Sequence, residues 1–103
     1  MSIPLTLLAE LKAKPGHAAE LGQRLHALIA PTRRESGCLG YVLHRSNDDP
    51  DLFVLYENWR SRADLDLHLA TPYLLDFFAH APQLLADEVR MRFFAPAIET
   101  IAA

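Results

Sequence analysis

Four short segments of the chain alternate between apolar and polar residues, which is typical of a β-strand with two different faces. The segments are 5–12, 38–45, 52–59 and 88–94. In the first, every second residue from Leu5 to Leu11 is apolar, and Leu8 adds an apolar group to the other face. Apolar groups on both faces indicate that this strand is buried on both sides. Four strands are therefore predicted.

Between the first two strands, the apolar residues follow a helical period instead. They are Ala18, Leu21, Leu25, Leu28 and Ile29. This spacing predicts an amphipathic helix that begins after a turn at 14–17. Pro31 lacks a backbone donor, so we expect it to kink or tighten the helix. Gly37 follows in the stretch ESG, and we expect it to end the helix in a left-handed conformation.

Turn-forming residues at 46–51 join the second and third strands into a hairpin. Ser61 is then expected to cap a short helix, with Asp64 as its capping-box partner. Thr71 and Pro72 would end that helix and start another, as its N-cap and first residue. The apolar face consists of Leu65, His68 and Leu69 in the first of these helices, and of Leu74, Phe77, Phe78 and Ala81 in the second.

The predicted order is strand, helix, strand, strand, helix, strand, which is the split βαβ arrangement of a ferredoxin-like α+β sandwich. We expect one domain over 1–103. The helices would cover one face of an antiparallel sheet and leave the other face open. Half of the residues are hydrophobic, so that open face would be rich in large apolar groups. A second copy packed face to face would bury it, which predicts a homodimer.

Charge and cysteine content exclude several classes of function. The net charge is -3, without a long run of either sign, so neither a nucleic-acid partner nor a membrane surface is expected. Cys38 is the one cysteine, which suits a reducing compartment. The chain shows no signal-peptide pattern, and no apolar run approaches the roughly 20 residues of a membrane span. A cytoplasmic protein is the expectation.

Four stretches resemble, in order and spacing, the successive motifs of the antibiotic biosynthesis monooxygenase family, and within it the small quinol monooxygenases. They are AELKAKPG (9–16), RRESGCLGYVLH (33–44), FVLYENW (53–59) and HLATPY (68–73). The resemblance implies a dimeric α+β barrel made of two ferredoxin-like sheets, with a pocket between sheet and helices in each subunit. It also implies oxidation of a quinol or related phenolic compound by molecular oxygen, with no cofactor and no metal.

Such a reaction needs a base with a near-neutral pKa, a dry cavity and donors for a developing oxyanion. His68 and Trp59 are the catalytic candidates. His68 titrates in the right range, but it could equally be a core histidine bonded to a carbonyl. Trp59 would stack on a flat substrate or hydrogen-bond to it, or else it packs in the core. Glu57, two residues before Trp59 on the same face of the strand, is expected to be structural, paired across strands or with Arg45 or Arg60, and a role as a base is the alternative.

Five further residues are candidates for substrate binding: Asn58, Tyr41, His44, Tyr73 and Arg90. Asn58 lies on the opposite face of its strand from Trp59, where an edge or dimer hydrogen bond is the alternative. Tyr41 and His44 point to opposite faces of the second strand. Tyr73 would lie at the pocket mouth, and Arg90 could steady an anionic substrate or belong to a solvated face. Which face of the sheet holds the pocket stays open at this point.

Some positions depart from the family pattern. Leu55 and Leu65 replace an Asn and a Tyr that the polyketide-tailoring relatives carry, and the first strand lacks the Asn of the haem-degrading relatives. The histidines show no metal-ligand spacing. Two functions therefore remain: a cofactor-independent monooxygenase acting on a quinol or similar electron-rich aromatic molecule, or a non-catalytic dimeric protein that binds or senses a small molecule.

Overall fold

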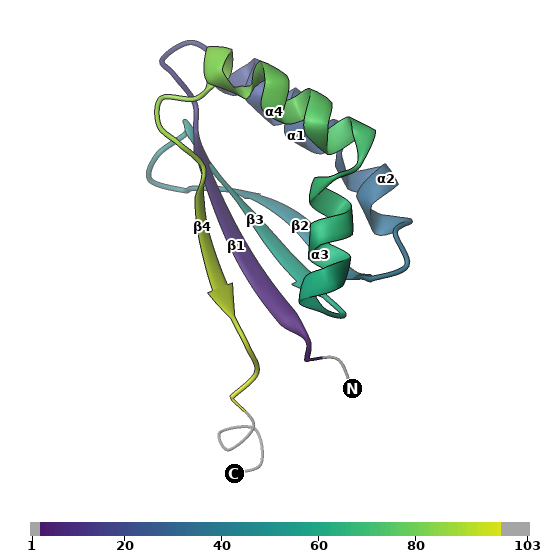
Figure 1. Ribbon diagram of the computed structural model, residues 1–103. Helices are drawn as coiled ribbons and strands as arrows, with labels where there is room; N and C mark the ends of the chain where they lie inside the picture. The colour runs from purple at the N-terminus through teal and green to yellow at the C-terminus, as the bar shows by residue number, and fades with distance from the viewer. Residues whose placement is uncertain (1–2, 98–103) are drawn as a thin grey trace.

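A computed structural model describes residues 3–97 as an antiparallel sheet whose one face is covered by helices (Figure 1). The strands are β1 (Leu5–Lys12), β2 (Cys38–Arg45), β3 (Leu52–Trp59) and β4 (Arg90–Phe94). Their order in the sheet is β2-β3-β1-β4, and every neighbouring pair is antiparallel. This confirms the ferredoxin-like prediction. The first three strands have the predicted bounds, whereas β4 begins at Arg90 rather than at Glu88.

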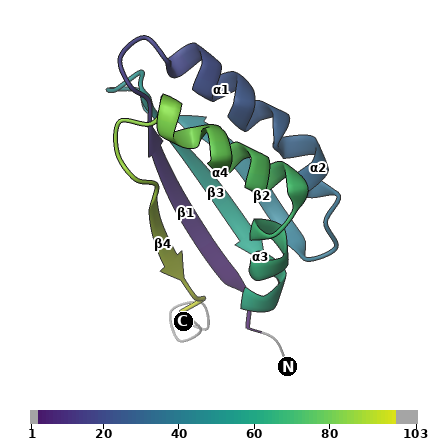
Figure 2. The ribbon, with the colours of Figure 1, turned by 45° about the horizontal axis from the view of Figure 1, so that its top comes forward.

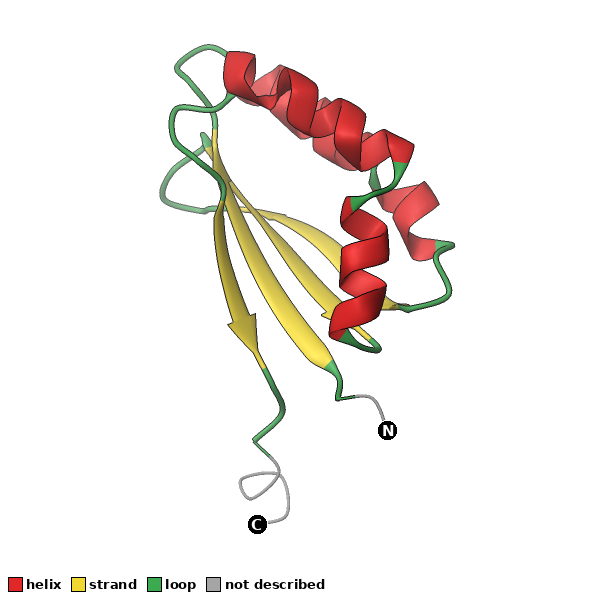
Figure 3. Ribbon diagram, in the orientation of Figure 1, coloured by secondary structure: helices red, strands yellow, loops and turns green. Residues whose placement is uncertain are grey.

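The helices lie on a single side of the sheet (Figures 2 and 3). They are α1 (Ala18–Ala27), α2 (Ile29–Arg33), α3 (Arg62–Leu69) and α4 (Pro72–Leu84). Helices α1 and α4 lie side by side over the sheet, and α3 stands near the end of β3 (Figures 1 and 2). Within the described residues, none of the helices has the length and apolar character needed to cross a bilayer.

The predicted first helix is divided into α1 and α2 at Leu28, just ahead of Pro31. Pro31 has no N–H, and its ring crowds the carbonyl of Ala27, so the regular helical bond between these two residues cannot form. The N–H of Leu28 bonds to the carbonyl of Leu25 instead, at 3.1 Å, which tightens the turn. The expected effect of Pro31 is therefore confirmed.

The prediction that Gly37 is left-handed is wrong. Among the described residues, Gly16 alone has a positive φ, of 82°. Gly37 is required for a different reason: a Cβ at this position would lie 2.3 Å from the Cγ atom of Asp64. The glycine lets the turn before β2 pack against the start of α3.

Local hydrogen bonds fix both ends of α3. The Oγ atom of Ser61 accepts a bond from the N–H of Asp64 at 3.2 Å, which confirms the predicted cap. At the other end, Thr71 and Pro72 are the N-cap and the first residue of α4, as predicted, but the hydroxyl of Thr71 donates to the carbonyl of His68 at 2.7 Å and makes no cap hydrogen bond to α4. The last turn of α3 is thereby tied to the first turn of α4, and this junction holds His68 in place.

The alternation of the strands sorts their side chains into two sets. The core lies between sheet and helices, where Leu7, Leu55 and Trp59 are almost completely buried. The opposite side, which we call the open face, carries Leu8, Val42, Val54, Tyr56 and Phe94. Val42 and Tyr56 are 40% and 42% exposed there. Large apolar groups therefore lie on both sides of the sheet, as predicted.

Candidate active site

A small enclosed cavity lies between the sheet and the helices. Its volume is about 20 Å³, which is room for about one water molecule. Most of its wall is aliphatic or aromatic, including Leu55 from β3 and Phe78 from α4. The polar side chains in the wall are Tyr41, Glu57 and His68. A mostly apolar cavity with three convergent polar groups is the kind of place where acid–base chemistry is found.

Glu57 is a carboxylic acid in the core. The β3 strand turns it towards the helices, and only 3% of its surface is exposed. Its Oε1 atom accepts a hydrogen bond of 3.0 Å from the indole Nε1 of Trp59. Burial raises the pKa of Glu57 to about 7, and this single hydrogen bond only partly opposes the shift. Glu57 can therefore gain or lose a proton close to neutral pH.

His68 is held by a carboxylate from the turn before β2. Its Nδ1 atom lies 2.7 Å from the Oε2 atom of Glu35, and the hydroxyl of Tyr73 donates a hydrogen bond to that same oxygen. A carboxylate only accepts, so Nδ1 carries the proton and the lone pair of the neutral ring is on Nε2. Within residues 3–97, no side chain bonds to Nε2.

The protonation of His68 is set by two opposing effects. The side chain is 1% exposed, and burial lowers the pKa of the imidazole below its usual value. The hydrogen bond and the negative charge of Glu35 act in the opposite direction. Burial has the larger effect, so His68 is a neutral base near pH 7. Its ring packs against Trp59, with 4.5 Å between the centroids.

Tyr41 supplies a hydroxyl without a partner. The side chain is 1% exposed, and its oxygen makes no hydrogen bond within the described residues; the same holds for the hydroxyl of Thr32. Burial raises the pKa of Tyr41 above its usual range, so the phenol stays protonated. The hydroxyl of Thr32 partly opposes this shift, so the two unpaired hydroxyls lie near each other, and either of them could still accept or donate one more hydrogen bond.

The site therefore combines a neutral imidazole, a carboxylic acid that titrates near pH 7 and a phenol donor. Such a set can take a proton from a phenolic substrate and stabilise the oxyanion that forms. Over residues 3–97, no three side chains of the His, Cys, Asp and Glu types are grouped so as to hold a metal ion.

Comparison with known proteins identifies the family. A family model described as antibiotic biosynthesis monooxygenase matches residues 4–80. The chain belongs to this family. A putative monooxygenase of Mycobacterium tuberculosis, Rv0793, is 37% identical to it over 102 residues, which are 99% of this chain and 100% of the relative. The probable quinol monooxygenase YgiN of Escherichia coli is 32% identical, over 91% and 99% of the two chains.

Other family members agree in fold. The crystal structure of PA3566 from Pseudomonas aeruginosa superposes with a TM-score of 0.88 and 43% sequence identity, covering 93% of this chain and 96% of that one. An uncharacterised Synechocystis protein, sll1783, is 32% identical over 88% of this chain, but the match spans only 62% of that relative's length. Sequence similarity therefore extends to a relative that is longer than this chain.

The structure gathers four of the residues proposed from the sequence of this monooxygenase-family chain. Tyr41 and His68 line the cavity. Trp59 packs behind His68 and is not part of the cavity wall, and its indole N–H is occupied by Glu57. Tyr73 reaches His68 through Glu35. In this geometry, Trp59 and Tyr73 support the two acid–base groups from outside the cavity.

The other three proposed residues lie on the open face of the sheet. Asn58 accepts a hydrogen bond of 2.7 Å there from the hydroxyl of Thr6 on β1. His44 and Arg90 are both exposed, on β2 and β4. The structure does not bring these three to the cavity, because strand alternation turns them away from the helices. The pocket lies on the helix-covered face, which the sequence had left open.

Sequence reasoning missed one residue of the candidate site, Glu35, and favoured a structural role for another, Glu57. Glu35 lies 33 positions before His68 and meets it only because the turn before β2 returns over α3. Glu57 was expected to pair with Arg45 or Arg60, but Arg60 pairs with Asp64 and Arg45 bonds to the carbonyl of Pro50. The one available signal was that Glu57 lies on the same face of β3 as the apolar residues Leu55 and Trp59.

Proposed function

We propose that this chain is a cofactor-independent monooxygenase that oxidises a quinol, or a similar electron-rich aromatic diol, with molecular oxygen. The observation that carries the proposal is the state of His68, a neutral imidazole in an enclosed cavity with Nδ1 held by Glu35 and Nε2 left free. Such a base can take a proton from a phenolic hydroxyl near neutral pH. The name of YgiN, a probable quinol monooxygenase, supports this substrate class.

The reaction balances without any other reductant. A hydroquinone and one O₂ give a hydroxyquinone and one water, so the substrate supplies all the electrons and keeps one oxygen atom. His68 would take the first phenolic proton at Nε2, which makes the ring electron-rich enough to transfer an electron to O₂. Tyr41 would donate a hydrogen bond to the resulting phenolate oxygen.

Glu57 would serve as the second proton carrier. Its raised pKa, about 7, allows it to accept the other phenolic proton or to return a proton to the departing water. Trp59 orients it through the 3.0 Å hydrogen bond and packs against His68. The indole of Trp59 therefore positions both Glu57 and His68.

The working unit would be a homodimer in which two open faces pack together. Val42, Tyr56 and Phe94 are each at least 40% exposed on that face, and burying them would remove apolar surface from water. The family's α+β barrel has this arrangement. The lone thiol of Cys38 suits the reducing cytoplasm as the place of action.

The same cavity also suits a non-catalytic protein that binds or senses an apolar molecule. Leu55 lies in the cavity wall where polyketide-tailoring relatives carry a polar residue, so the wall is apolar at that point. In that case a quinone would bind without turnover.

Isotope labelling separates the two functions. Metal-free protein is mixed with 2-methyl-1,4-dihydroxynaphthalene under ¹⁸O₂, and the product is analysed by mass spectrometry. A monooxygenase gives a hydroxyquinone with one labelled oxygen, and catalase does not return any consumed O₂. Unlabelled quinone, with O₂ returned by catalase as in autoxidation, would exclude the enzyme function.

A further inference from the structure

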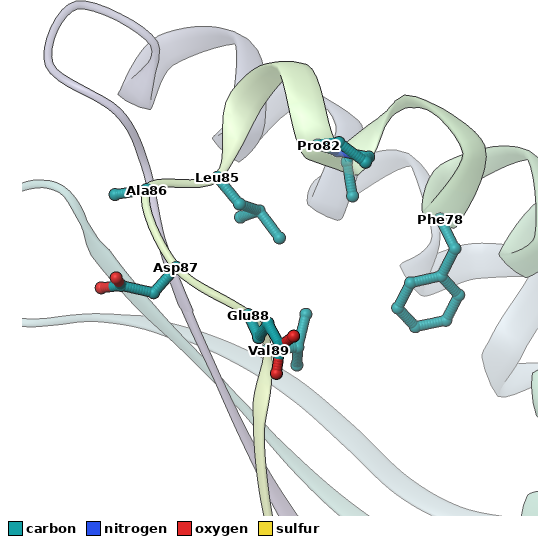
Figure 4. A pocket seen from close by; sticks show the side chains of 8 residues that line it. Phe78, Pro82, Leu85, Ala86, Asp87, Glu88 and Val89 are labelled. Atoms are coloured by element: carbon teal, nitrogen blue, oxygen red, sulfur yellow. The ribbon is translucent and has the colours of Figure 1, made fainter.

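A groove runs along the surface between the C-terminal half of α4 and the segment 85–89 that leads into β4 (Figure 4). Its volume is about 640 Å³, within the usual range of small-molecule sites. Its apolar wall consists of Phe78, Ala81, Pro82, Leu85, Ala86 and Val89. The remaining wall residues are Asp87 and Glu88, so the formal charges of the described groove are both negative.

The groove and the enclosed cavity share two wall residues. Phe78 from α4 and Val89 ahead of β4 line both spaces, so their side chains separate one from the other. The cavity offers about 20 Å³, whereas a cavity that holds benzene measures roughly 150 Å³. An aromatic ring can therefore reach His68 only when this wall moves.

We propose that the groove is the substrate entrance, that Phe78 and Val89 form its gate, and that it selects uncharged aromatic diols over anionic ones. This inference rests on the proposed function and names the substrate class more narrowly.

The charges along the route support that selection. Neither the groove nor the cavity is lined by a Lys or Arg within residues 3–97, while Asp87 and Glu88 lie at the entrance and Glu57 inside. An anion would lose its hydration beside carboxylates and meet no cation in exchange. Two basic groups, Lys12 and Arg90, line a neighbouring hollow that shares Asp87 and Glu88 with the groove, but neither of them lines the groove itself.

Lys12 offers little compensation there, because it pairs with Asp49 at 3.0 Å. Arg90, which could have held an anionic substrate, lines that hollow with three carboxylates, Glu10, Asp87 and Glu88, and lies outside both the groove and the cavity. An uncharged quinol loses no ionic hydration on entering and finds an apolar wall.

Trp59 makes the entrance measurable without turnover. It is the single tryptophan. The centroid of its ring lies 4.5 Å from that of His68, and His68 is part of the cavity wall. A quinone that reaches the cavity should quench its fluorescence. The probes are 2,3-dimethyl-1,4-naphthoquinone, which has no free ring position for addition of the Cys38 thiol, and its 6-sulfonate, which is a permanent anion.

The first experiment tests the charge selection by equilibrium quenching. Wild-type protein should bind the neutral quinone at least about tenfold more tightly than the sulfonate. The variant Asp87→Asn/Glu88→Gln should reduce this ratio by about 3- to 10-fold, and raising the ionic strength should reduce it in the wild type. A control that removes two exposed charges on other helices, Glu20→Gln/Asp66→Asn, should keep the wild-type ratio. Equal affinities in the wild type, or an unchanged ratio in the rim variant, would overturn the selection.

The second experiment tests the gate by stopped-flow quenching. Phe78→Ala should speed the association of the neutral quinone by about threefold or more, whereas Val89→Phe should slow it. Leu75→Ala, on the exposed side of the same helix, should leave the rate unchanged. If Phe78→Ala folds poorly, Phe78→Leu takes its place and should show a smaller increase. Rates that do not respond to Phe78 and Val89 would place the entrance elsewhere.

Failure of this inference is distinct from failure of the enzyme function. Quenching reports entry of an oxidised quinone that cannot turn over, so selective entry without ¹⁸O incorporation would leave a selective binding protein. Labelled product with unselective, gate-independent entry would leave the oxygenase and overturn the entrance.

Discussion

The two faces of the sheet treat the same kinds of residues in opposite ways. On the helix-covered face, Glu57 and His68 are 3% and 1% exposed, and no cation lines their cavity within the described residues. On the open face, Glu10 pairs with Arg92 across the strands, and His44 is exposed to solvent. Burial, and not residue type, distinguishes the two faces, because loss of water raises the pKa of Glu57 to about 7 and lowers that of His68, which keeps the imidazole neutral.

The largest expected difference between the faces is in activity. His68→Gln should lower quinol oxidation by about 100- to 10,000-fold, because the amide cannot accept the phenolic proton. His44→Gln should stay within about twofold of the wild type, because its imidazole lies away from the cavity. O₂ consumption by metal-free protein measures both, and thermal unfolding checks that both fold. Equal losses would contradict the assignment of the pocket to the helix-covered face.

A second difference is in the pH dependence of stability. The folded pKa of Glu57, about 7, lies above its unfolded value. At low pH, Glu57 is protonated in both the folded and the unfolded state, so its burial costs no ionisation energy. The free energy of unfolding falls as the pH rises from the pKa of unfolded Glu57 to the pKa of folded Glu57. At about pH 8, Glu57→Gln should raise the free energy of unfolding by about 3 kcal/mol, with little change at about pH 4.

The matched control is Glu10, a carboxylate on β1 that faces the other way. Glu10→Gln should change the free energy of unfolding by no more than about 1 kcal/mol and by a similar amount at both pH values, because Glu10 is partly exposed and keeps Arg92 as its partner. Urea denaturation at the two pH values measures both variants. If Glu57→Gln is no more stable than the wild type at about pH 8, then ionisation of the buried Glu57 does not destabilise the folded protein, and the prediction is wrong.

The open face is expected to be covered by a second copy of the chain, whereas the other face is covered by the chain's own helices. Tyr56→Glu should weaken self-association by about 100-fold or more, because a charge would be buried between two sheets. Leu67→Glu is the control, since Leu67 is 68% exposed on α3 and lies away from the sheet. Sedimentation equilibrium over a range of concentrations measures both. A wild-type monomer, or a dimer insensitive to Tyr56→Glu, would break the face-to-face arrangement.

The sequence was sufficient for the fold because the burial of each strand alternates with its residues. The bounds of β1, β2 and β3, the Ser61 cap and the break near Pro31 all depend on neighbours within a few positions. Gly37 shows the limit of this reasoning: the glycine is there for the close approach of Asp64, a contact that depends on how the turn before β2 meets α3.

The candidate site was less predictable for the same physical reason. His68 and Tyr41 were found because their residue types suit the chemistry, but Asn58, His44 and Arg90 suit it equally well. What separates the two groups is the side of the sheet that the helices cover, and alternation alone cannot give that. Glu57 is a candidate proton carrier because the neighbours expected to pair with it, Arg45 and Arg60, bond elsewhere.

The smallest effect concerns the support of His68. Glu35 raises the pKa of the imidazole against the effect of burial, so Glu35→Gln should make it a weaker base and lower activity by about tenfold. The acid limb of the pH–rate profile should move to lower pH, and the ¹⁵N shifts of His68 should show a mixture of tautomers. Tyr73→Phe, which removes only the bond to Glu35, should lower activity by about threefold and keep the Nδ1–H tautomer. If Glu35→Gln loses activity but keeps the pH profile and the His68 tautomer of the wild type, then Glu35 is a purely structural residue. In that case Glu35 would not set the basicity of His68.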